Sequence, residues 1–257
     1  MATWTAFPHT HEYAIDAASI ALQWSRLHDG DQEPLPANEQ VLAAWALFHQ
    51  GEFRQACDAG LQAGPEGITV ANKACCIYAN YLEPKEKTKL DLFLQVAERA
   101  ACQATAEPGN ANAFYWQAYA LGRYSQGISV SKALAQGLGS KVKMALEQTI
   151  RLQPLHADAH IALGTFHAEV IDKVGPLIGN MTYGAKKDTS LAMFKQGLQL
   201  TPNAPIALVE YANALIMLEG DQRMEEATQL YERAASCNAQ DAVERLDVDL
   251  AQAELAS

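Results

Sequence analysis

The feature that most constrains this 257-residue chain is a recurring pattern of apolar, helix-period stretches that end in proline. Residues 152–154 (Leu-Gln-Pro) and 200–202 (Leu-Thr-Pro) close two such stretches, and Pro108 closes a third. Pro108, Pro154 and Pro202 are 46 and 48 residues apart. Because proline cannot continue a helix, each marks a stop after which a new helix begins. A helix–stop–helix unit that recurs at this spacing predicts an all-α repeat protein.

The apolar stretches that follow these prolines resemble one another. Each carries a small residue at the same place, which permits close contact between helices: Ala118, Gly164 and Ala212. The pattern resembles the tetratricopeptide repeat, a helix–turn–helix unit of about 34 residues with a Trp-x2-Leu-Gly-x2-Tyr signature. Leu163 and Gly164 match the Leu-Gly pair, and His167 takes the place of the tyrosine. Residues 50–56 and 225–234 resemble the turn and second helix of further repeats.

This resemblance implies an α–α superhelix, or solenoid, that forms a single domain over residues 1–257. A helix at 12–27 and a linker fill residues 1–36, the repeats fill 37–240, and a capping helix fills 241–257. That last segment is amphipathic, as the end of a solenoid requires. About five helix pairs are expected, at 38–64, 68–106, 111–153, 157–201 and 204–238.

Two repeats are longer than the tetratricopeptide unit, and their extra residues lie at 124–139 and 170–187. The two inserts are related, because Gly127 and Gly175 are 48 residues apart. Insertions at equivalent places of neighbouring repeats project from one side of a solenoid, so the inserts are expected to meet there. Lengthened repeats are also similar to those of the T-component proteins of tripartite carboxylate transporters and of eukaryotic regulators of microtubule dynamics.

In the tetratricopeptide family, set positions of the first helices line a concave groove. Aromatic rings beside amides suit peptide recognition, because the rings give contact area at low entropic cost. The alternative is that Trp45, Tyr115 and Tyr119 only pack, in a groove that the inserts cover. In the second repeat the same positions indicate Asn72, Cys76 and Asn80. The groove residues expected to bind are Trp45, Phe48, Tyr115, Tyr119, Arg123, Ile161, Asn213 and Met217.

Charge is distributed unevenly along the chain. The formal net charge is −11, which argues against general nucleic-acid binding. Residues 123–195 nevertheless hold nine Lys or Arg against five Asp or Glu. This window predicts a basic insert side that binds an anionic ligand or acidic segment, with Arg123 as a fork-shaped carboxylate donor; ordinary solvated lysines are the alternative. The insert-side candidates are Lys141, Lys186 and Lys187.

Motifs of catalysis are absent from the sequence. It has no GxSxG, no P-loop and no GxGxxG, so we expect no enzyme, no catalytic residue and no cofactor. His160 and His167 fall on packing positions of the repeat, so no metal site is expected from them or from His156. The N-terminus lacks a signal peptide pattern, and no apolar run could span a bilayer. Five cysteines in apolar helical patterns indicate buried free thiols, and the protein is expected to be cytoplasmic.

The sequence therefore predicts a protein-interaction scaffold that binds a peptide or protein segment in its groove and on its insert ridge. The competing hypothesis is an accessory protein that binds a small anionic or amphipathic molecule, with the inserts closing the groove into a pocket. A third hypothesis is a homo-oligomer, formed through helix 12–27 or helix 241–255.

Overall fold

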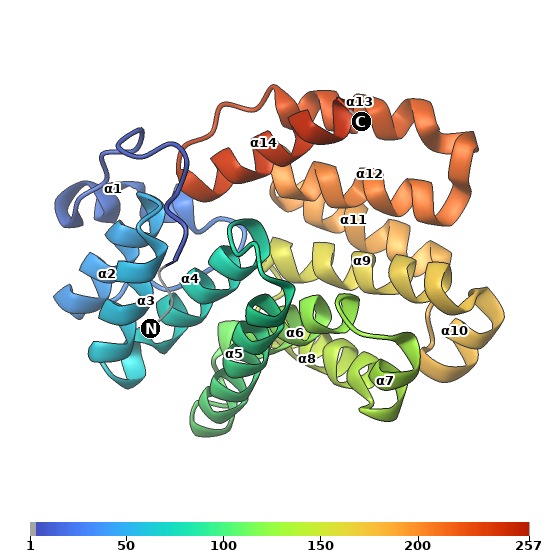
Figure 1. The fold of residues 1–257 in the computed structure, drawn as a ribbon, viewed down its shortest axis with the longest axis horizontal. Coiled ribbons are helices and arrows are strands. Elements are labelled where there is room, and N and C mark those ends of the chain that lie inside the picture. The colour runs from blue at the N-terminus through green and yellow to red at the C-terminus, as the bar shows by residue number, and fades with distance from the viewer. Residues whose placement is uncertain (1–3, 257) are drawn as a thin grey trace. The chain divides into compact units, whose positions relative to one another are not determined.

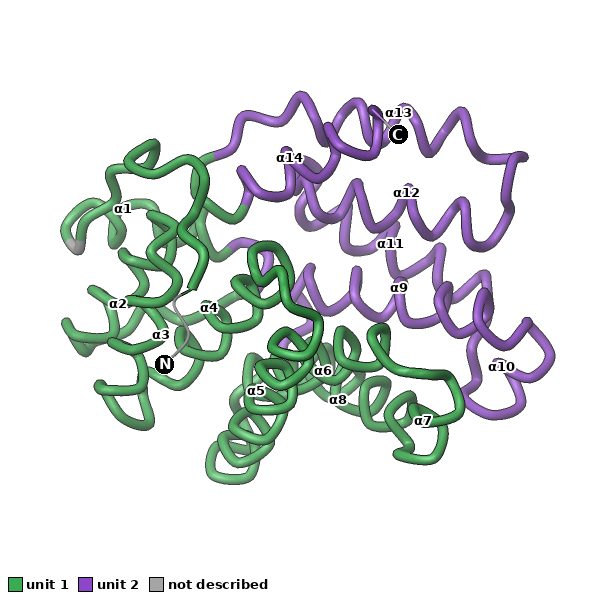
Figure 2. Tube along the Cα trace, viewed as in Figure 1, with its two compact units in different colours: residues 1–28, 32–152, 240–243 green, residues 29–31, 153–239, 244–257 purple. Residues whose placement is uncertain are grey.

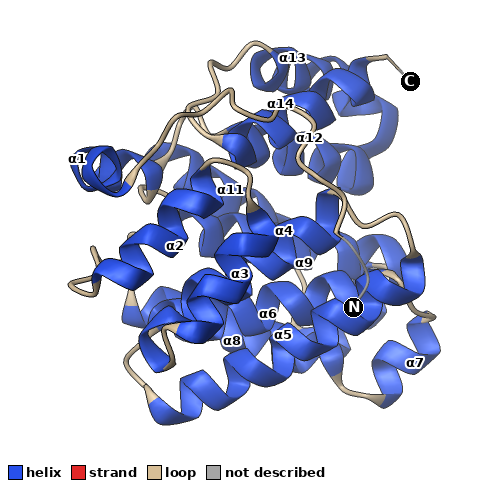
Figure 3. Cartoon of the chain, turned by 60° about the vertical axis from the view of Figure 1, so that its left-hand side comes forward, coloured by secondary structure: helices blue, strands red, loops and turns tan. Residues whose placement is uncertain are grey.

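The computed structural model describes residues 4–256, and these contain helices and no strand (Figures 1 and 3). Contacts divide them into two compact units (Figure 2). Unit 1 comprises residues 4–28, 32–152 and 240–243, and unit 2 comprises residues 29–31, 153–239 and 244–256. The sequence-based expectation of a single domain stays a prediction.

Unit 1 is a stack of helix hairpins. Its helices are α1 (Ala17–Leu27), α2 (Glu39–His49), α3 (Phe53–Gln62), α4 (Ile68–Tyr81), α5 (Glu86–Ala106), α6 (Ala111–Gln126), α7 (Val130–Ala135) and α8 (Leu138–Leu152). Helices that are consecutive in the series α2, α3, α4, α5, α6 and α8 pack on one another. The first helices α2, α4 and α6 also contact one another in sequence, which is the arrangement that stacked helical repeats require.

Unit 2 repeats this arrangement. It contains α9 (Ala157–Val174), α10 (Pro176–Tyr183), α11 (Lys187–Leu200), α12 (Pro205–Glu219) and α13 (Met224–Ala235), and α14 (Ala242–Leu255) begins in unit 1 and continues in unit 2. The first helices α9 and α12 pack together, and the second helices α11 and α13 pack on them. The helix pairs expected from the sequence are therefore confirmed.

Small residues set how closely these helices approach. A Cβ on Gly164 of α9 would lie 2.9 Å from the ring of Phe194 in α11. The Ser190 hydroxyl donates to the carbonyl oxygen of Gly164 at 2.7 Å across the same crossing. Gly60 of α3 approaches the backbone of Gly67 just as closely. The role expected for Gly164 as a close-contact residue is confirmed.

Two expectations need correction. The N-terminal helix begins at Ala17 rather than residue 12, because the Asp16 carboxylate accepts the N–H groups of Ala18 and Ser19 and caps it there. Each insert segment contains a short helix, α7 or α10, and its first residues extend α6 or α9. Of the cysteines, Cys102 is exposed. That the two inserts meet stays a prediction, since α7 belongs to unit 1 and α10 to unit 2.

Candidate functional site

The first helices of unit 1 present a face that the chain's own N-terminal region covers. Trp45, Phe48 and His49 share this face of α2, and each is at most 1% exposed. The ring of Trp24 in α1 meets the ring of Trp45 edge-on, with centroids 5.9 Å apart. The His28 ring meets Trp45 in the same manner at 4.7 Å. The aromatic residues expected to line the groove in α2 are therefore packed beneath other residues of the same chain.

The linker after α1 folds back along the same face. The Trp24 indole N–H donates to the carbonyl oxygen of Glu33 at 2.8 Å, which fixes the linker relative to α1. The Asn112 amide at the start of α6 donates to the Glu33 carboxylate at 2.6 Å. Upstream of α1, the Gln50 amide donates to the carbonyl oxygen of Ile15 at 2.5 Å. We call residues 15–28 and 32–36 the covering segment.

A lysine completes the surface beneath this segment. The Nζ of Lys73 in α4 lies 5.6, 5.2 and 6.0 Å from the ring centroids of Trp45, Phe48 and Trp116. A cation at these distances from ring faces is stabilised by their quadrupoles. We call the surface of α2, α4 and α6 formed by Trp45, Phe48, His49, Lys73, Asn112 and Trp116 the covered face. It is aromatic at its centre and carries a cation and an amide donor.

A buried polar chain lies at the edge of the covered face. The Nδ1 atom of His49 is 2.6 Å from a carboxylate oxygen of Asp241, and its Nε2 atom is 3.4 Å from Nε2 of His28. All three residues are at most 5% exposed. Buried polar groups must be hydrogen-bonded to be tolerated, so this chain fixes the covering segment and the start of α14 to α2.

The groove residues predicted on α4, the first helix of the second pair, need correction. The Asn72 side chain is turned toward α5, where it accepts from Nε of Arg99 at 2.6 Å. Cys76 is fully buried. Lys73, one residue along from Asn72, instead contacts the aromatic rings of the covered face. The register expected for α4 was therefore wrong.

The remaining groove candidates of unit 1 lie on α6. Tyr115 is buried against Trp116, and Tyr119 is half-buried beside both. The Arg123 guanidinium lies 5.3 Å from the Tyr119 ring centroid and donates to the Gln126 side chain at 3.3 Å. Arg123 is therefore held by its own helix.

In unit 2, the groove candidates have internal partners. Ile161 is 5% exposed and packs in the core of α9, α11 and α12. The Tyr231 hydroxyl of α13 donates to the Asn213 side chain of α12. Met217 is half-buried and packs against the same core as Ile161. Whether any of these residues contacts a partner stays a prediction.

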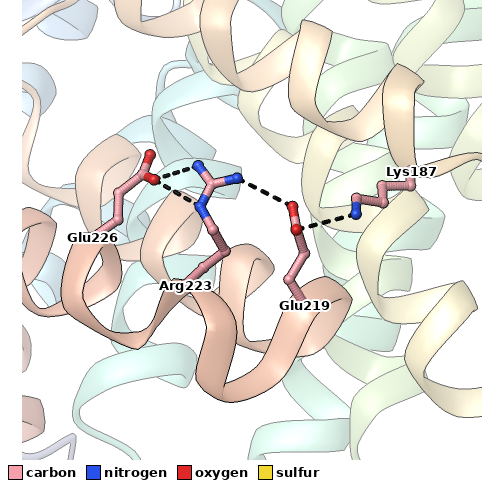
Figure 4. Close-up of polar contacts among 4 residues, drawn as sticks. All are labelled: Lys187, Glu219, Arg223 and Glu226. Carbon is pink, nitrogen blue, oxygen red and sulfur yellow. Dashed lines mark hydrogen bonds and ion pairs between the residues drawn. The ribbon is translucent and has the colours of Figure 1, made fainter.

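The insert-side lysines belong to different units, so a shared basic surface stays a prediction. Lys141, in unit 1, and Lys186 and Lys187, in unit 2, are exposed. Lys187 pairs with Glu219 at 3.2 Å, and Glu219 also pairs with Arg223 at 3.2 Å; Arg223 in turn pairs with Glu226, forming a chain of alternating charge (Figure 4). The positive charge of Lys187 is thus balanced within unit 2.

The exposed surface of unit 2 offers two further features. Leu177, Ile178 and Met181 on α10 are 73%, 57% and 79% exposed, and their spacing places them on neighbouring positions of this short helix. Two open hollows adjoin each other where α11 and α13 flank Tyr211, with Leu198 shared by both. Both hollows are open-sided, unlike the enclosing pockets that small ligands prefer.

The histidines of α9 serve its backbone. His156 Nδ1 accepts the N–H of Ala159 and caps the helix, and His167 Nδ1 accepts the N–H of Lys186. His160 Nε2 contacts the carbonyl oxygen of Pro154 at 3.0 Å. These bonds give each ring a local structural role. No described helix has both the length and the apolar character that crossing a membrane demands.

Comparison with known proteins supports the fold. No protein family pattern and no curated protein sequence matches the chain. Among solved structures, the chain is similar to a thermophilic TPR protein from Thermus thermophilus, with a TM-score of 0.58 and 18% sequence identity over 83% of this chain and 97% of that chain. The predicted all-α, tetratricopeptide-like superhelical fold is therefore confirmed, and this fold is typical of scaffolds for protein–protein interaction.

Sequence reasoning missed the covering segment. It treated the region before α2 as an incomplete helix and a linker, whereas the structure places Trp24, His28 and Glu33 on the covered face. A signal was present, because residues 29–36 hold three acids and two prolines and follow a tryptophan-bearing amphipathic helix. Such a segment resembles a peptide ligand as much as a linker.

Proposed function

We propose that this chain is a non-catalytic protein-interaction scaffold that binds a peptide or protein segment on the covered face and on the α10 insert. One observation carries the proposal: the covered face already holds a polypeptide segment, through the Trp24 ring and the Glu33 carboxylate. A surface that recognises its own chain in this manner has the chemistry to recognise another.

The contacts on the covered face are those that peptides use. A tryptophan side chain anchors in an aromatic setting, where large buried rings dominate binding energies. The Asn112 amide donates to a side-chain carboxylate, and a charged acceptor makes such a bond about twice as strong as a neutral one. Together these contacts recognise an aromatic side chain and a negative charge that follows it along the same segment.

The α10 insert supplies the second proposed contact. Its Leu177, Ile178 and Met181 are each more than half exposed and lie within one short helix of unit 2. Clustered apolar side chains on a surface are typical of interaction sites, whereas single ones are not. Methionine adapts its shape readily, which suits a surface that must fit a partner.

The proposal is tested by affinity capture from the native host, followed by mass spectrometry of the retained proteins. We expect a protein retained by the wild type to be lost when Leu177, Ile178 and Met181 are all replaced by serine. Met144→Ser is the matched control, because Met144 is 68% exposed on α8 and lies outside both proposed contacts. Identical retained proteins for the triple variant and the wild type would remove α10 from the proposal.

The small-molecule hypothesis is tested on the same preparation. Native mass spectrometry of the purified chain would show a ligand as a fixed added mass, and a stoichiometric ligand would favour that hypothesis over the scaffold.

Light scattering tests the proposed homo-oligomer, and fractionation of host cells tests the proposed cytoplasmic location.

A further inference from the structure

We infer that the covering segment is an intrachain ligand that a partner displaces, and that the partner carries the same chemistry: an aromatic anchor on a helical turn, followed by a carboxylate on non-helical chain. The inference rests on the proposed function, because it names the occupant of the covered face. It assigns to residues 15–28 and 32–36 a role beyond connecting the N-terminus to the repeats.

Few side chains of α1 itself are buried, and Ile15 and His28, on either side of α1, are buried as well. Among the described side chains of α1, only Ile20 and Trp24 are buried, and Leu22 is 90% exposed. The main helix contact of α1 is with α2. A segment with few buried apolar contacts opens at a lower free energy than the core helices do. Release of α1 therefore leaves the hairpin stack of α2 to α8 with its own contacts.

The segment and the face are complementary in hydrogen bonding. Residues 32–36 of the covering segment carry one acid, Glu33, and no lysine or arginine. The Asn112 amide donates to the Glu33 carboxylate at 2.6 Å, and the cation of Lys73 lies on the same covered face. A partner that supplies a carboxylate to Asn112 is therefore the one that this face accepts.

The segment's form restricts the partner further. Gly30, Pro34 and Pro36 disfavour helix after Leu27, and the chain between α1 and α2 contains no helix. Trp24 lies on the last turns of α1, and its indole N–H holds the Glu33 carbonyl oxygen. The partner is thus expected to present an aromatic side chain at the end of a helix and a carboxylate on the non-helical chain that follows.

Covalent linkage gives the covering segment an advantage over any free peptide. A tethered ligand acts at an effective concentration of about millimolar. Wild-type protein should therefore bind a free copy of the segment poorly, and weakening the tethered copy should open the face. This difference makes the inference measurable with the protein's own sequence as the probe.

The experiment uses a fluorescently labelled synthetic peptide of residues 15–36 and the full-length chain, with binding followed by fluorescence anisotropy. We expect Trp24→Ala protein to bind the peptide at least about tenfold more tightly than wild type does. Leu22→Ala protein is the matched control, because Leu22 lies on the same helix but faces solvent. It should bind the peptide as wild type does. A peptide with Glu33→Gln should bind the Trp24→Ala protein about tenfold more weakly, because the charged acceptor for Asn112 is gone.

Circular dichroism decides whether each variant is folded. If Trp24→Ala protein is unfolded, Glu33→Gln protein takes its place with a smaller expected gain. Unfolding of both would show that the segment belongs to the core, and would overturn the inference. The inference would also be overturned if the Trp24→Ala protein, or the Glu33→Gln protein in its place, bound the peptide no more tightly than the wild-type and Leu22→Ala proteins do.

The same peptide separates this inference from the proposed function. A captured host protein that an excess of peptide fails to release would leave the scaffold in place and refute the shared chemistry. Peptide binding to the opened protein, with no host protein captured by any variant, would refute the scaffold and leave the intrachain ligand standing.

Discussion

At the residue scale, the crossing of α9 and α11 depends on the absence of a single methyl group. A Cβ on Gly164 would meet the ring of Phe194, which is fully buried and stacked on Tyr211 at 5.1 Å. The ring cannot retreat, so Gly164→Ala forces the helices apart. We expect a loss of about 1–3 kcal/mol in the free energy of unfolding, measured by urea denaturation.

The matched control is Gly122→Ala on α6. A Cβ there would have no heavy atom within 4 Å, so only the helix propensity changes. We expect the free energy of unfolding to stay the same or to rise by up to about 1 kcal/mol. Equal losses for both variants would mean that close packing at Gly164 is not what its substitution disturbs.

A second residue-scale prediction concerns Tyr231. Its hydroxyl donates to Asn213, and burial, together with the nearby Glu254 and Glu210 carboxylates, raises the pKa of Tyr231 to about 12. At neutral pH we expect Tyr231→Phe to lower the free energy of unfolding by about 0.5–1.5 kcal/mol, through the lost hydrogen bond.

The pH dependence of that difference has a definite sign. Between pH 10 and about 12 the unfolded tyrosine releases its proton while the folded one keeps it. The folded state then binds more protons, so its stability falls as pH rises. The wild type should therefore lose its advantage over Tyr231→Phe across this range, as urea denaturation at several pH values would show. A constant gap would contradict the raised pKa.

At the element scale, the apolar side chains of α10 are expected to contribute to binding and not to stability. Replacing Leu177, Ile178 and Met181 by serine should change the free energy of unfolding by less than about 0.5 kcal/mol for each, because each faces solvent. Leu215→Ala, in the fully buried core of α12, should cost about 2–5 kcal/mol. Thermal unfolding of the two variants compares them directly, and a large loss from the α10 triple variant would show that this helix is packed.

The same scale shows how much of the fold the sequence could predict. The helix pairs from α2 to α13 followed from proline stops and apolar period, since both signals are local. The start of α1 did not, because the Asp16 cap outweighs the helix-compatible residues before it. The short helices α7 and α10 were missed for a similar reason: each is brief, and α10 exposes its apolar side chains instead of burying them.

The candidate site shows which features local sequence patterns could not predict. The repeat pattern predicted Trp45 and Phe48 on the groove side of a first helix, and the structure buries Trp45 beneath Trp24 and packs Phe48 against Phe53 of α3. The segment that covers Trp45 could not be predicted in this way. The bond between Glu33 and Asn112 joins residues 79 positions apart, and no periodicity within either segment encodes such a pairing. The register expected for α4 missed Lys73, because α4 is buried on nearly every side and its apolar pattern marks no single face.

At the scale of the whole molecule, each unit has helices that pack mainly on their neighbours, so damage to one core should be felt first in that unit. Leu208→Ala in unit 2 removes a side chain that is 1% exposed among Leu230, Tyr231 and Ala251. We expect it to raise amide hydrogen exchange in α12, then in α11 and α13, while α2 and α3 stay protected. Phe48→Ala in unit 1 should produce the converse pattern, and mass spectrometry of peptic fragments resolves the two. Uniform exchange along the chain in both variants would show cooperative unfolding across both units, and would favour the single domain over residues 1–257 that the sequence predicts.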